Sequence, residues 1–416
     1  MAGEKRVVIG GVDTHKDVHV AAVIDRMGKV IDTADFVTSA RGCRDLVAWM
    51  GSFGHVTKVG VEGTGAYGAG LTRHLAAAGI EVVEVNRPNR QARRRRGKSD
   101  TVDAEAAARA ALNGEAAAVP KTQDSFVTSI RVLRVAFGSA RNGRTRVALQ
   151  IRDLIVTAPD ELRAVLGPLA SDDRAARCAR FHVTGDAADP LVGTKLALRT
   201  LARRYQALST EMAELEAALD ELTARANPAL RGARGVGTDV ASILLVAAGD
   251  NPERLKSEAA FAALCGVSPV EASSGKTVRH RLNRSGNRQA NHALWRIVMV
   301  RLGTGDPATM AYVERRTAEG KSRREIIRCL KRYVAREIYR HLMRPEAVPA
   351  GHDLRAGRLA AHISLQTVAT ALASWPTRIS ELERGLKHDT DLARRYSEWL
   401  DWNQSMDVPN APTQAA

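Results

Sequence analysis

The first 115 residues alternate short apolar runs with amphipathic stretches. Apolar runs over 7–12, 18–24 and 30–37 predict three consecutive strands, with a turn at Arg26-Met-Gly between the second and third. A helix capped by Ser39 is predicted to run to about Met50, and two more are predicted over 67–78 and 100–112. Two further strands are predicted over 58–62 and 80–85. The resulting order, βββαβαβα, is that of a ribonuclease-H-like α/β fold, although other α/β domains also contain it.

The middle of the chain has a helical period. Two long helices are predicted over 124–157 and 191–226, and the stretch between them, 158–190, has little pattern. The second helix has a heptad seam, formed by Leu198, Leu201, Tyr205, Leu208, Met212, Leu215, Leu219 and Leu222. The seam either joins protomers in a coiled coil or packs within one chain against the stripe Leu133, Phe137, Ala140, Val147, Ile151 and Leu154. The sequence leaves both interpretations open.

Pro228 ends the second long helix, and 228–345 is predicted to be an all-α, basic domain. Gly235 and Gly237 lie in a stretch that resembles a helix-hairpin-helix turn, in which backbone amides approach a phosphate. An ordinary glycine-containing turn is the alternative. The segment 315–340 predicts one amphipathic helix with a basic outer face, either solvated or in contact with nucleic acid. Residues 346–416 predict a helical extension with a disordered end.

These patterns divide the chain into an α/β domain over 1–120, a helical coiled-coil region over 121–227 with the insertion 158–190, the domain 228–345, and the extension 346–416. Composition adds the class of partner. The 416 residues include 44% hydrophobic and 26% charged positions, and the net charge of +16 favours a polyanion such as nucleic acid. Because there is no apolar run of about 18 residues and no signal-peptide core, we expect a cytoplasmic protein without membrane contact.

Two features narrow the chemistry further. The four cysteines form no CxxC pair, which argues against a zinc site or a disulfide scaffold. The segment 87–98 contains seven basic residues and no acid. Such a segment is either a solvated loop or a contact with phosphates, and its position directly before a pair of carboxylates favours phosphate contact. The residues predicted to make this contact are Arg93, Arg94, Arg95, Arg96 and Lys98.

Four carboxylates lie at the predicted ends of strands and helices. Asp13 follows the first strand, Glu62 ends the fourth, and Asp100 and Asp103 share one face of a helix. Each alone is commonly a cap or a surface charge, and Asp100 in particular suits a helix N-cap. Together they predict a site for Mg²⁺ or Mn²⁺, which carboxylates bind well. Two such ions support phosphodiester cleavage.

Several motifs now resemble one family. They are Glu62-Gly-Thr-Gly-Ala-Tyr67, Lys98-Ser-Asp100-Thr-Val-Asp103, Arg234-Gly-Val-Gly237, Phe261-Ala-Ala-Leu-Cys-Gly266-Val-Ser-Pro269, Ser273-Ser274-Gly275 and Arg284-Ser285-Gly286-Asn287. The chain resembles the DEDD-type insertion-sequence transposases, the family of bridge-RNA-guided serine recombinases. The resemblance covers 5–115 as a RuvC-like domain and resumes within 228–345. It is weak over 158–190 and does not extend to 346–416.

The resemblance implies roles for particular residues. The metal-binding acids of the family fall on Asp13, Glu62, Asp100 and Asp103, and its nucleophilic serine falls on Ser274, directly before Gly275. It implies strand exchange through a phosphoserine intermediate. It also implies donor and target DNA and a structured non-coding bridge RNA as partners, and dimers that assemble into tetramers in the bacterial cytoplasm, on the nucleoid when DNA is bound. Further nucleic-acid contacts are predicted at Gly235, Gly237, Lys276, Arg284, Asn287, Arg323 and Arg324.

Two other functions compete with the recombinase. One is a metal-dependent RuvC-like nuclease that resolves junctions with water as the nucleophile, in which case the Ser274 region only binds nucleic acid. The other is a nucleic-acid-binding protein without catalysis.

Overall fold

The computed structural model of the chain describes residues 6–85, 99–122, 125–275, 280–343 and 348–406. It divides into two compact units. The first comprises 1–125 and 249–254, and the second comprises 126–248 and 255–416. The predicted phosphate contacts at Arg93, Arg94, Arg95, Arg96, Lys98 and Lys276 lie outside the described residues.

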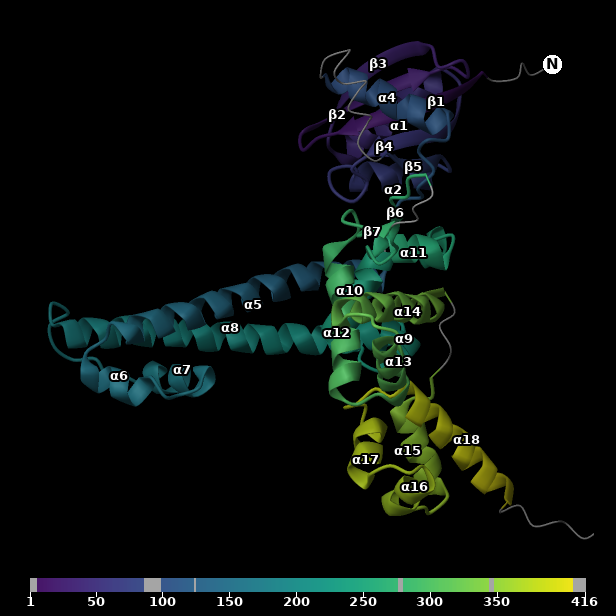
Figure 1. Cartoon of the computed structure of the whole chain (residues 1–416). Helices are drawn as coiled ribbons and strands as arrows, with labels where there is room; N and C mark the ends of the chain where they lie inside the picture. Colours follow the sequence, from purple (N-terminus) through teal and green to yellow (C-terminus); the bar gives the residue numbers. More distant parts are fainter. Residues whose placement is uncertain (1–5, 86–98, 123–124, 276–279, 344–347, 407–416) are drawn as a thin grey trace, which may run out of the picture. The chain divides into compact units, whose positions relative to one another are not determined.

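The first unit is built on a mixed five-stranded sheet (Figure 1). Its strands are β1 (Val7–Thr14), β2 (Val18–Ile24), β3 (Val30–Val37), β4 (His55–Glu62) and β5 (Glu81–Val85), in the order β3-β2-β1-β4-β5. β1 and β3 run antiparallel to β2, whereas β4 runs parallel to both β1 and β5. This topology agrees with the α/β order predicted from the sequence. β1 extends two residues beyond the prediction, so Asp13 is part of the strand, and β4 begins at His55 rather than Lys58.

Helices cover both faces of this sheet. α1 (Ala40–Ser52) and α2 (Ala69–Ala77) pack on one face, where Leu46, Met50 and Leu71 are fully buried. α4 (Asp100–Leu112) covers the opposite face with a row of buried alanines. The α1 helix is capped by Ser39, as predicted. The sheet therefore has two different cores, and α4 forms the one on the face of Gly11 and Gly60.

Two glycines allow α4 to lie unusually close to the sheet. A Cβ atom added to Gly11 in β1 would lie 2.2 Å from the carbonyl oxygen of Ala104. A Cβ atom added to Gly60 in β4 would lie 2.4 Å from the carbonyl oxygen of Ala107. Because real Cβ atoms do not approach other atoms so closely, neither position accepts a side chain unless the helix moves. These glycines fix the height of α4 above the sheet.

The second unit contains a long antiparallel helix pair, α5 (Phe126–Val156) and α8 (Pro190–Ala226), which lie side by side in Figure 1. Leu198 and Tyr205 of the heptad seam are buried against Val147 and Ile151 of α5. The structure thus contains the intrachain packing that the sequence left as one of two interpretations, and the joining of protomers stays a prediction. The insertion 158–190 forms two short helices, α6 (Asp160–Leu166) and α7 (Ser171–Ala179).

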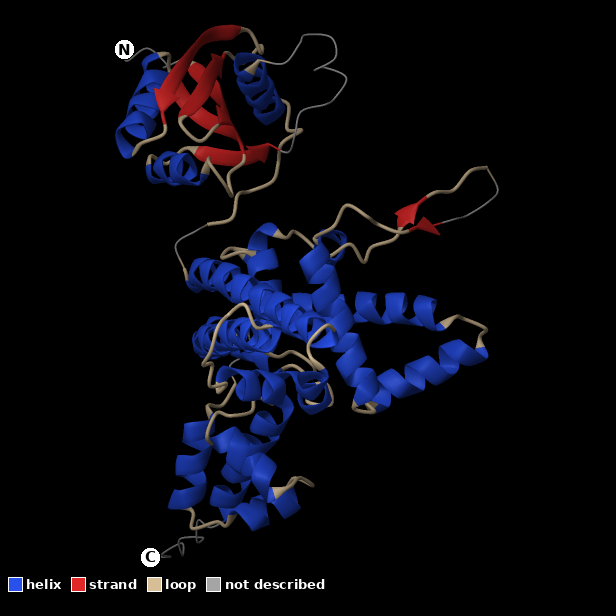
Figure 2. Ribbon diagram, turned by 90° about the vertical axis from the view of Figure 1, so that its left-hand side faces the viewer, coloured by secondary structure: helices blue, strands red, loops and turns tan. Residues whose placement is uncertain are grey.

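The body of the second unit is a bundle around the buried helix α10 (Thr238–Ala248). Around it lie α9 (Pro228–Gly232), α11 (Glu258–Leu264), α12 (Arg288–Gly303), α13 (Pro307–Ala318) and α14 (Arg323–Met343). The single helix predicted over 315–340 is wrong, because the chain breaks between α13 and α14 at Gly320, whose φ is +79°. The all-α prediction also fails locally. A two-stranded antiparallel ribbon, β6 (Val270–Glu271) and β7 (His280–Arg281), interrupts the helices (Figure 2).

The C-terminal part of the second unit has a core of its own. It consists of α15 (Gly351–Ala360), α16 (Leu365–Ala371), α17 (Pro376–Glu383) and α18 (Thr390–Met406). Inside it, Arg358 donates two hydrogen bonds to the carboxylate of Glu383, at 2.7 and 2.9 Å, and the hydroxyl of Tyr396 donates a third at 2.7 Å. In the part of the chain that the structure describes, none of the helices combines the length and apolarity needed to cross a bilayer.

Candidate functional site

The carboxyl ends of β1 and β4 meet the start of α4 at one corner of the first unit. Asp13 lies two positions after Gly11, and Glu62 lies two positions after Gly60. Because alternate residues of a strand share a face, both acids lie on the face that α4 covers. Val12 and Val61 are register partners on adjacent parallel strands, so Asp13 and Glu62 reach the same level of the sheet. The Thr14 hydroxyl donates a hydrogen bond of 2.7 Å to the main-chain oxygen of Glu62, which ties the two strand ends together.

The first turn of α4 brings the other two acids to this corner. Ser99 is the N-cap, and its hydroxyl accepts a hydrogen bond of 3.3 Å from the backbone N–H of Val102. Asp100 therefore is not the cap and has its carboxylate available for other contacts. The Asp100 side chain is 54% exposed, whereas Asp103 is buried at 3% exposure. Asp100 thus lies on the solvent side of the corner, and Asp103 lies on its buried side.

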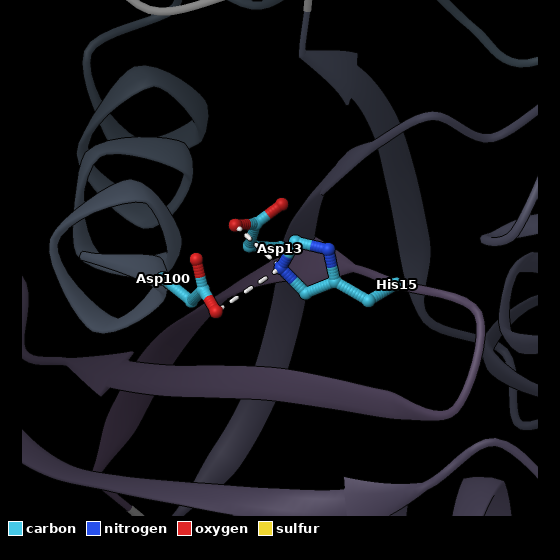
Figure 3. Close-up of side chains that lie close together, drawn as sticks. All are labelled: Asp13, His15 and Asp100. Atoms are coloured by element: carbon cyan, nitrogen blue, oxygen red, sulfur yellow. Dashed lines mark ion pairs between the residues drawn. The ribbon is translucent and has the colours of Figure 1, made fainter. Parts of the chain in front are cut away.

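His15 joins this group, although the sequence did not single it out as a site residue. Its Nε2 lies 3.2 Å from Oδ2 of Asp13 and 3.4 Å from Oδ2 of Asp100, as Figure 3 shows. Asp13, His15 and Asp100 offer ligand atoms that all lie within 4.8 Å of one another. Glu62 and Asp103 do not belong to that closest group. The signal for His15 was its spacing, because residues two apart at a strand end project to the same side.

The electrostatics of Asp13 reflect crowding by like charges. Burial raises the pKa of Asp13 above its ordinary value, and the nearby carboxylates of Asp103 and Asp100 raise it further, while His15 opposes the rise. A carboxylate in this position is costly to ionise unless a cation lies beside it. The clustered oxygen donors suit a hard divalent cation such as Mg²⁺ or Mn²⁺. The residues at this corner therefore fit the predicted metal.

Ser274 belongs to the second unit and lies between the two strands of the ribbon. It is exposed, as are the residues on either side of it. Gly275 follows with φ of +56°, in the left-handed region that favours glycine. The Ser-Gly pair thus has a local backbone reason, because a residue with a side chain is strained at this positive φ.

The fold itself accounts for several other predicted contacts. Gly235 has φ of +84°, and an added Cβ atom would lie 3.2 Å from the carbonyl oxygen of Ile297, so the backbone conformation and the tight contact both favour glycine there. Asn287 caps α12, because its side-chain oxygen accepts a hydrogen bond of 3.0 Å from the backbone N–H of Ala290. By contrast, the glycine at 237 has open space around it. Their contact with nucleic acid stays a prediction.

The remaining predicted cations lie at the surface. Arg284 is exposed in the turn before α12, and Arg323 and Arg324 are exposed at the start of α14. The start of α10 differs from the expected phosphate site. Its first-turn Asp239 already pairs with Arg134 and Arg296, so a carboxylate occupies the positive end of that helix.

Two family models of known proteins match the chain over the ranges that contain the four acids and Ser274. Residues 10–158 match a family model of DEDD transposases of IS110 elements, described as a transposase, and this range contains all four acids. Residues 227–314, which contain Ser274, match a model described as a transposase of the IS116/IS110/IS902 family. The chain is also 29% identical over 175 residues to the "Insertion element IS110 uncharacterized 43.6 kDa protein" of Streptomyces coelicolor.

That alignment covers 40% of this chain and 43% of the relative, so the chain spans less than half the length of the curated protein it matches. The two family models, however, both describe transposases of the IS110 type, and they match separate stretches of the chain. Between them, the two models span the carboxylate corner, formed by Asp13, Glu62, Asp100 and Asp103, and the β6–β7 ribbon with Ser274. Over both of these stretches, the chain is similar to transposases of the IS110 family.

Proposed function

We propose that this protein cuts and rejoins DNA strands, with Ser274 as the attacking group and the carboxylate corner of the first unit as its metal site. The observation that supports this most strongly is the convergence of Asp13, Glu62, Asp100 and Asp103 on one edge of the sheet, on the face covered by α4. Four acids from three separate elements repel one another when they are ionised, and a bound cation removes that cost.

Asp13, Glu62, Asp100 and Asp103 would hold the metal, with His15 at the entrance of the site. Divalent cations, when bound, neutralise charge on the scissile phosphate and lower the pKa of an attacking hydroxyl. The acids also exclude competing anions from the corner, so that a phosphate binds there only together with cations. His15 keeps Asp13 and Asp100 oriented toward each other through its two contacts.

Ser274 supplies the covalent step. Its Oγ forms a bond to phosphorus, the bond from phosphorus to one strand oxygen breaks, and that oxygen takes up a proton as the serine hydroxyl loses one. The hydroxyl of a second strand then displaces Oγ from phosphorus and restores the serine. Because the phosphoserine ester retains the free energy of the phosphodiester bond, rejoining the strands requires no nucleoside triphosphate. The exposure of Ser274 on a ribbon suits a nucleophile that must reach a DNA backbone.

Partners follow from the same proposal. The net charge of +16 favours binding to phosphate backbones of donor and target DNA. We propose that a structured bridge RNA selects the sequences by base pairing, so that the protein contacts mainly backbones. The working particle would be a dimer or tetramer in the bacterial cytoplasm, where it associates with the nucleoid through DNA. The long α5–α8 pair would offer one surface for such assembly.

One experiment separates strand exchange from hydrolysis. Protein purified with its bound RNA is incubated with donor and target DNA and Mg²⁺, and products are compared for the wild type, Ser274→Ala and Ser273→Ala. We expect Ser274→Ala to lose both cleavage and joining, and Ser273→Ala to keep them. A phosphoserine adduct trapped by the wild type should map to Ser274 by mass spectrometry. If Ser274→Ala still cuts DNA, the nucleophile is water and the protein is a nuclease.

A second variant tests the metal site independently of Ser274. Asp13→Asn preserves the shape of the side chain but removes its charge, so we expect weaker Mn²⁺ binding by calorimetry and loss of cleavage. If Asp13→Asn binds Mn²⁺ and cleaves as the wild type does, the carboxylate corner is not the metal site. If Asp13→Asn binds nucleic acid as the wild type does, and neither protein cleaves DNA, the protein binds nucleic acid without catalysis.

A further inference from the structure

The second unit contains a cavity of about 560 Å³ at the foot of the β6–β7 ribbon. One wall is formed by 266–269, which precede β6, and by 280–283, which begin with β7. The opposite wall is formed by α13 and α14, through Tyr312, Arg328 and Tyr333 among others. Cavities of about 300–1,000 Å³ commonly hold ligands larger than a simple ion. This one lies within a single unit, so its shape does not depend on how the two units are arranged.

The cavity is strongly cationic. Seven lysine and arginine side chains line it, and none of its described lining residues is an acid. Nearby carboxylates offset only part of this charge, because Glu258 pairs with Arg332 and Arg336, and Glu319 pairs with Arg316. Within the described part of the chain, no carboxylate lies within 4.0 Å of the cationic groups of Arg281, Arg315 or Arg328. An excess of fixed positive charge in a concave site attracts a polyanion and holds its phosphates.

Aromatic rings distinguish this cavity from a plain anion site. Tyr312 and Tyr333 meet edge to face with their ring centres 5.3 Å apart. The guanidinium groups of Arg315 and Arg336 lie over these rings, at 5.2 Å from Tyr312 and 5.8 Å from Tyr333. The large aromatic side chain of Tyr333 is 51% exposed. Flat rings and flat guanidinium groups side by side are the surfaces on which unpaired bases stack.

We propose that this cavity binds one unpaired nucleotide of a nucleic-acid strand, with its base against Tyr333 and its phosphate between Arg281 and Arg328. The nucleotide must be unpaired, because a base in a duplex is covered on both faces by its neighbours. The chemistry is common to DNA and RNA, and the site reads the presence of a free base and a phosphate. The proposal rests on the proposed function only in assigning nucleic acid as the partner.

The position of the cavity gives this binding a consequence. Arg281 belongs to β7, the strand that returns from the turn containing Ser274, and β6 and β7 pair through Val270 with Arg281 and Glu271 with His280. A strand held at Arg281 is therefore attached to the base of the ribbon that presents Ser274. Binding there would fix one nucleotide of the substrate or guide strand relative to the serine, and would favour strands opened near the reaction point over closed duplex.

Binding without catalysis tests the proposal directly. The probe is a fluorescein-labelled oligothymidylate of about 12 nucleotides, with oligouridylate of the same length as the RNA arm and a hairpin duplex as the paired arm. Affinity is measured by anisotropy for the full chain freed of its RNA. Tyr333→Leu keeps an apolar side chain at an exposed position but removes the ring. We expect it to weaken single-strand binding about five- to a hundred-fold and to change duplex binding little.

The charge is tested with a matched pair of variants. Arg328→Gln removes a cation from the cavity, and Arg355→Gln removes an exposed cation from α15, away from it. We expect Arg328→Gln to lower the slope of log affinity against log salt by about 0.7, and Arg355→Gln to leave the slope unchanged. Thermal unfolding of each variant confirms that the fold is intact. Equal slopes for the two variants contradict a phosphate contact at Arg328.

Photocrosslinking locates the base. An oligonucleotide with 5-iodouracil, irradiated with wild-type protein, should crosslink to the peptide containing Tyr333 or Tyr312. The DNA and RNA arms show which strand occupies the site. Crosslinks found only elsewhere, together with wild-type affinity of Tyr333→Leu, overturn the proposal. That result does not affect the proposed function, which is tested separately with Ser274→Ala. Conversely, cleavage by Ser274→Ala would contradict the proposed function but would not affect the nucleotide site.

Discussion

The distance between α4 and the sheet is the structural quantity on which the carboxylate corner depends, and Gly11→Ala tests it. The new Cβ atom would lie 2.2 Å from the carbonyl oxygen of Ala104 and 2.2 Å from the backbone nitrogen of Ala108. Ordinary van der Waals contact begins at 3.4 Å, so α4 must retreat by about 1.2 Å. Both neighbouring atoms are backbone, so no side-chain rotation relieves the clash, and the whole first turn of the helix moves with it.

The expected effect has two parts. Overpacking of this kind costs about 1–3 kcal/mol of the free energy of unfolding. In addition, Asp100 and Asp103 move away from Asp13, because they are fixed to α4 while Asp13 is fixed to β1. We expect Gly11→Ala to unfold at lower urea concentration and to bind Mn²⁺ more weakly by calorimetry than the wild type, even under conditions where both are fully folded.

Gly51→Ala in α1 is the matched control. A Cβ atom at position 51 meets nothing within 4 Å, so this change only improves helix propensity, by up to about 1 kcal/mol. It should leave Mn²⁺ binding unchanged. If Gly11→Ala matches Gly51→Ala in both stability and Mn²⁺ affinity, close packing of α4 does not position the acids.

Two further predictions concern the second unit. Burial alone would raise the pKa of Asp239, but the hydrogen bonds and charges of Arg134 and Arg296 outweigh it and lower the pKa. Asp239→Asn should destabilise the protein by about 3 kcal/mol at pH 7. The difference should shrink below about pH 3.9, where the wild type loses this contribution as its folded-state carboxylate protonates; a gap in urea midpoint that is constant down to pH 2.5 would contradict this. Glu383→Gln leaves the buried Arg358 without its carboxylate and should lower the free energy of unfolding by about 3–5 kcal/mol. Hydrogen exchange should then show faster exchange of the amides in α15–α18; unchanged protection there would show that the pair is dispensable.

The sequence predicted much of the first unit because its patterns are local. Strand and helix identity follow from periods of two and 3.6 residues, and Ser39 marks a helix start through its own side chain. The four acids were found in the same way, since each lies at an element end that the pattern reveals. The break between α13 and α14 was missed because the charged and apolar spacing continues across it, and only the backbone of Gly320 records the turn.

What only the tertiary structure decided is which distant residues meet. The order of the strands places β1 beside β4, and the missing side chains of Gly11 and Gly60 let α4 descend on them. His15 joined the corner through that arrangement. The cavity at the ribbon depends on α13 and α14 turning back toward a two-stranded element absent from the sequence pattern. Local spacing in the sequence determines the face of a helix or strand on which a side chain lies. Which elements lie next to each other depends on strand pairing and on backbone contacts, and these produce no periodic pattern in the sequence.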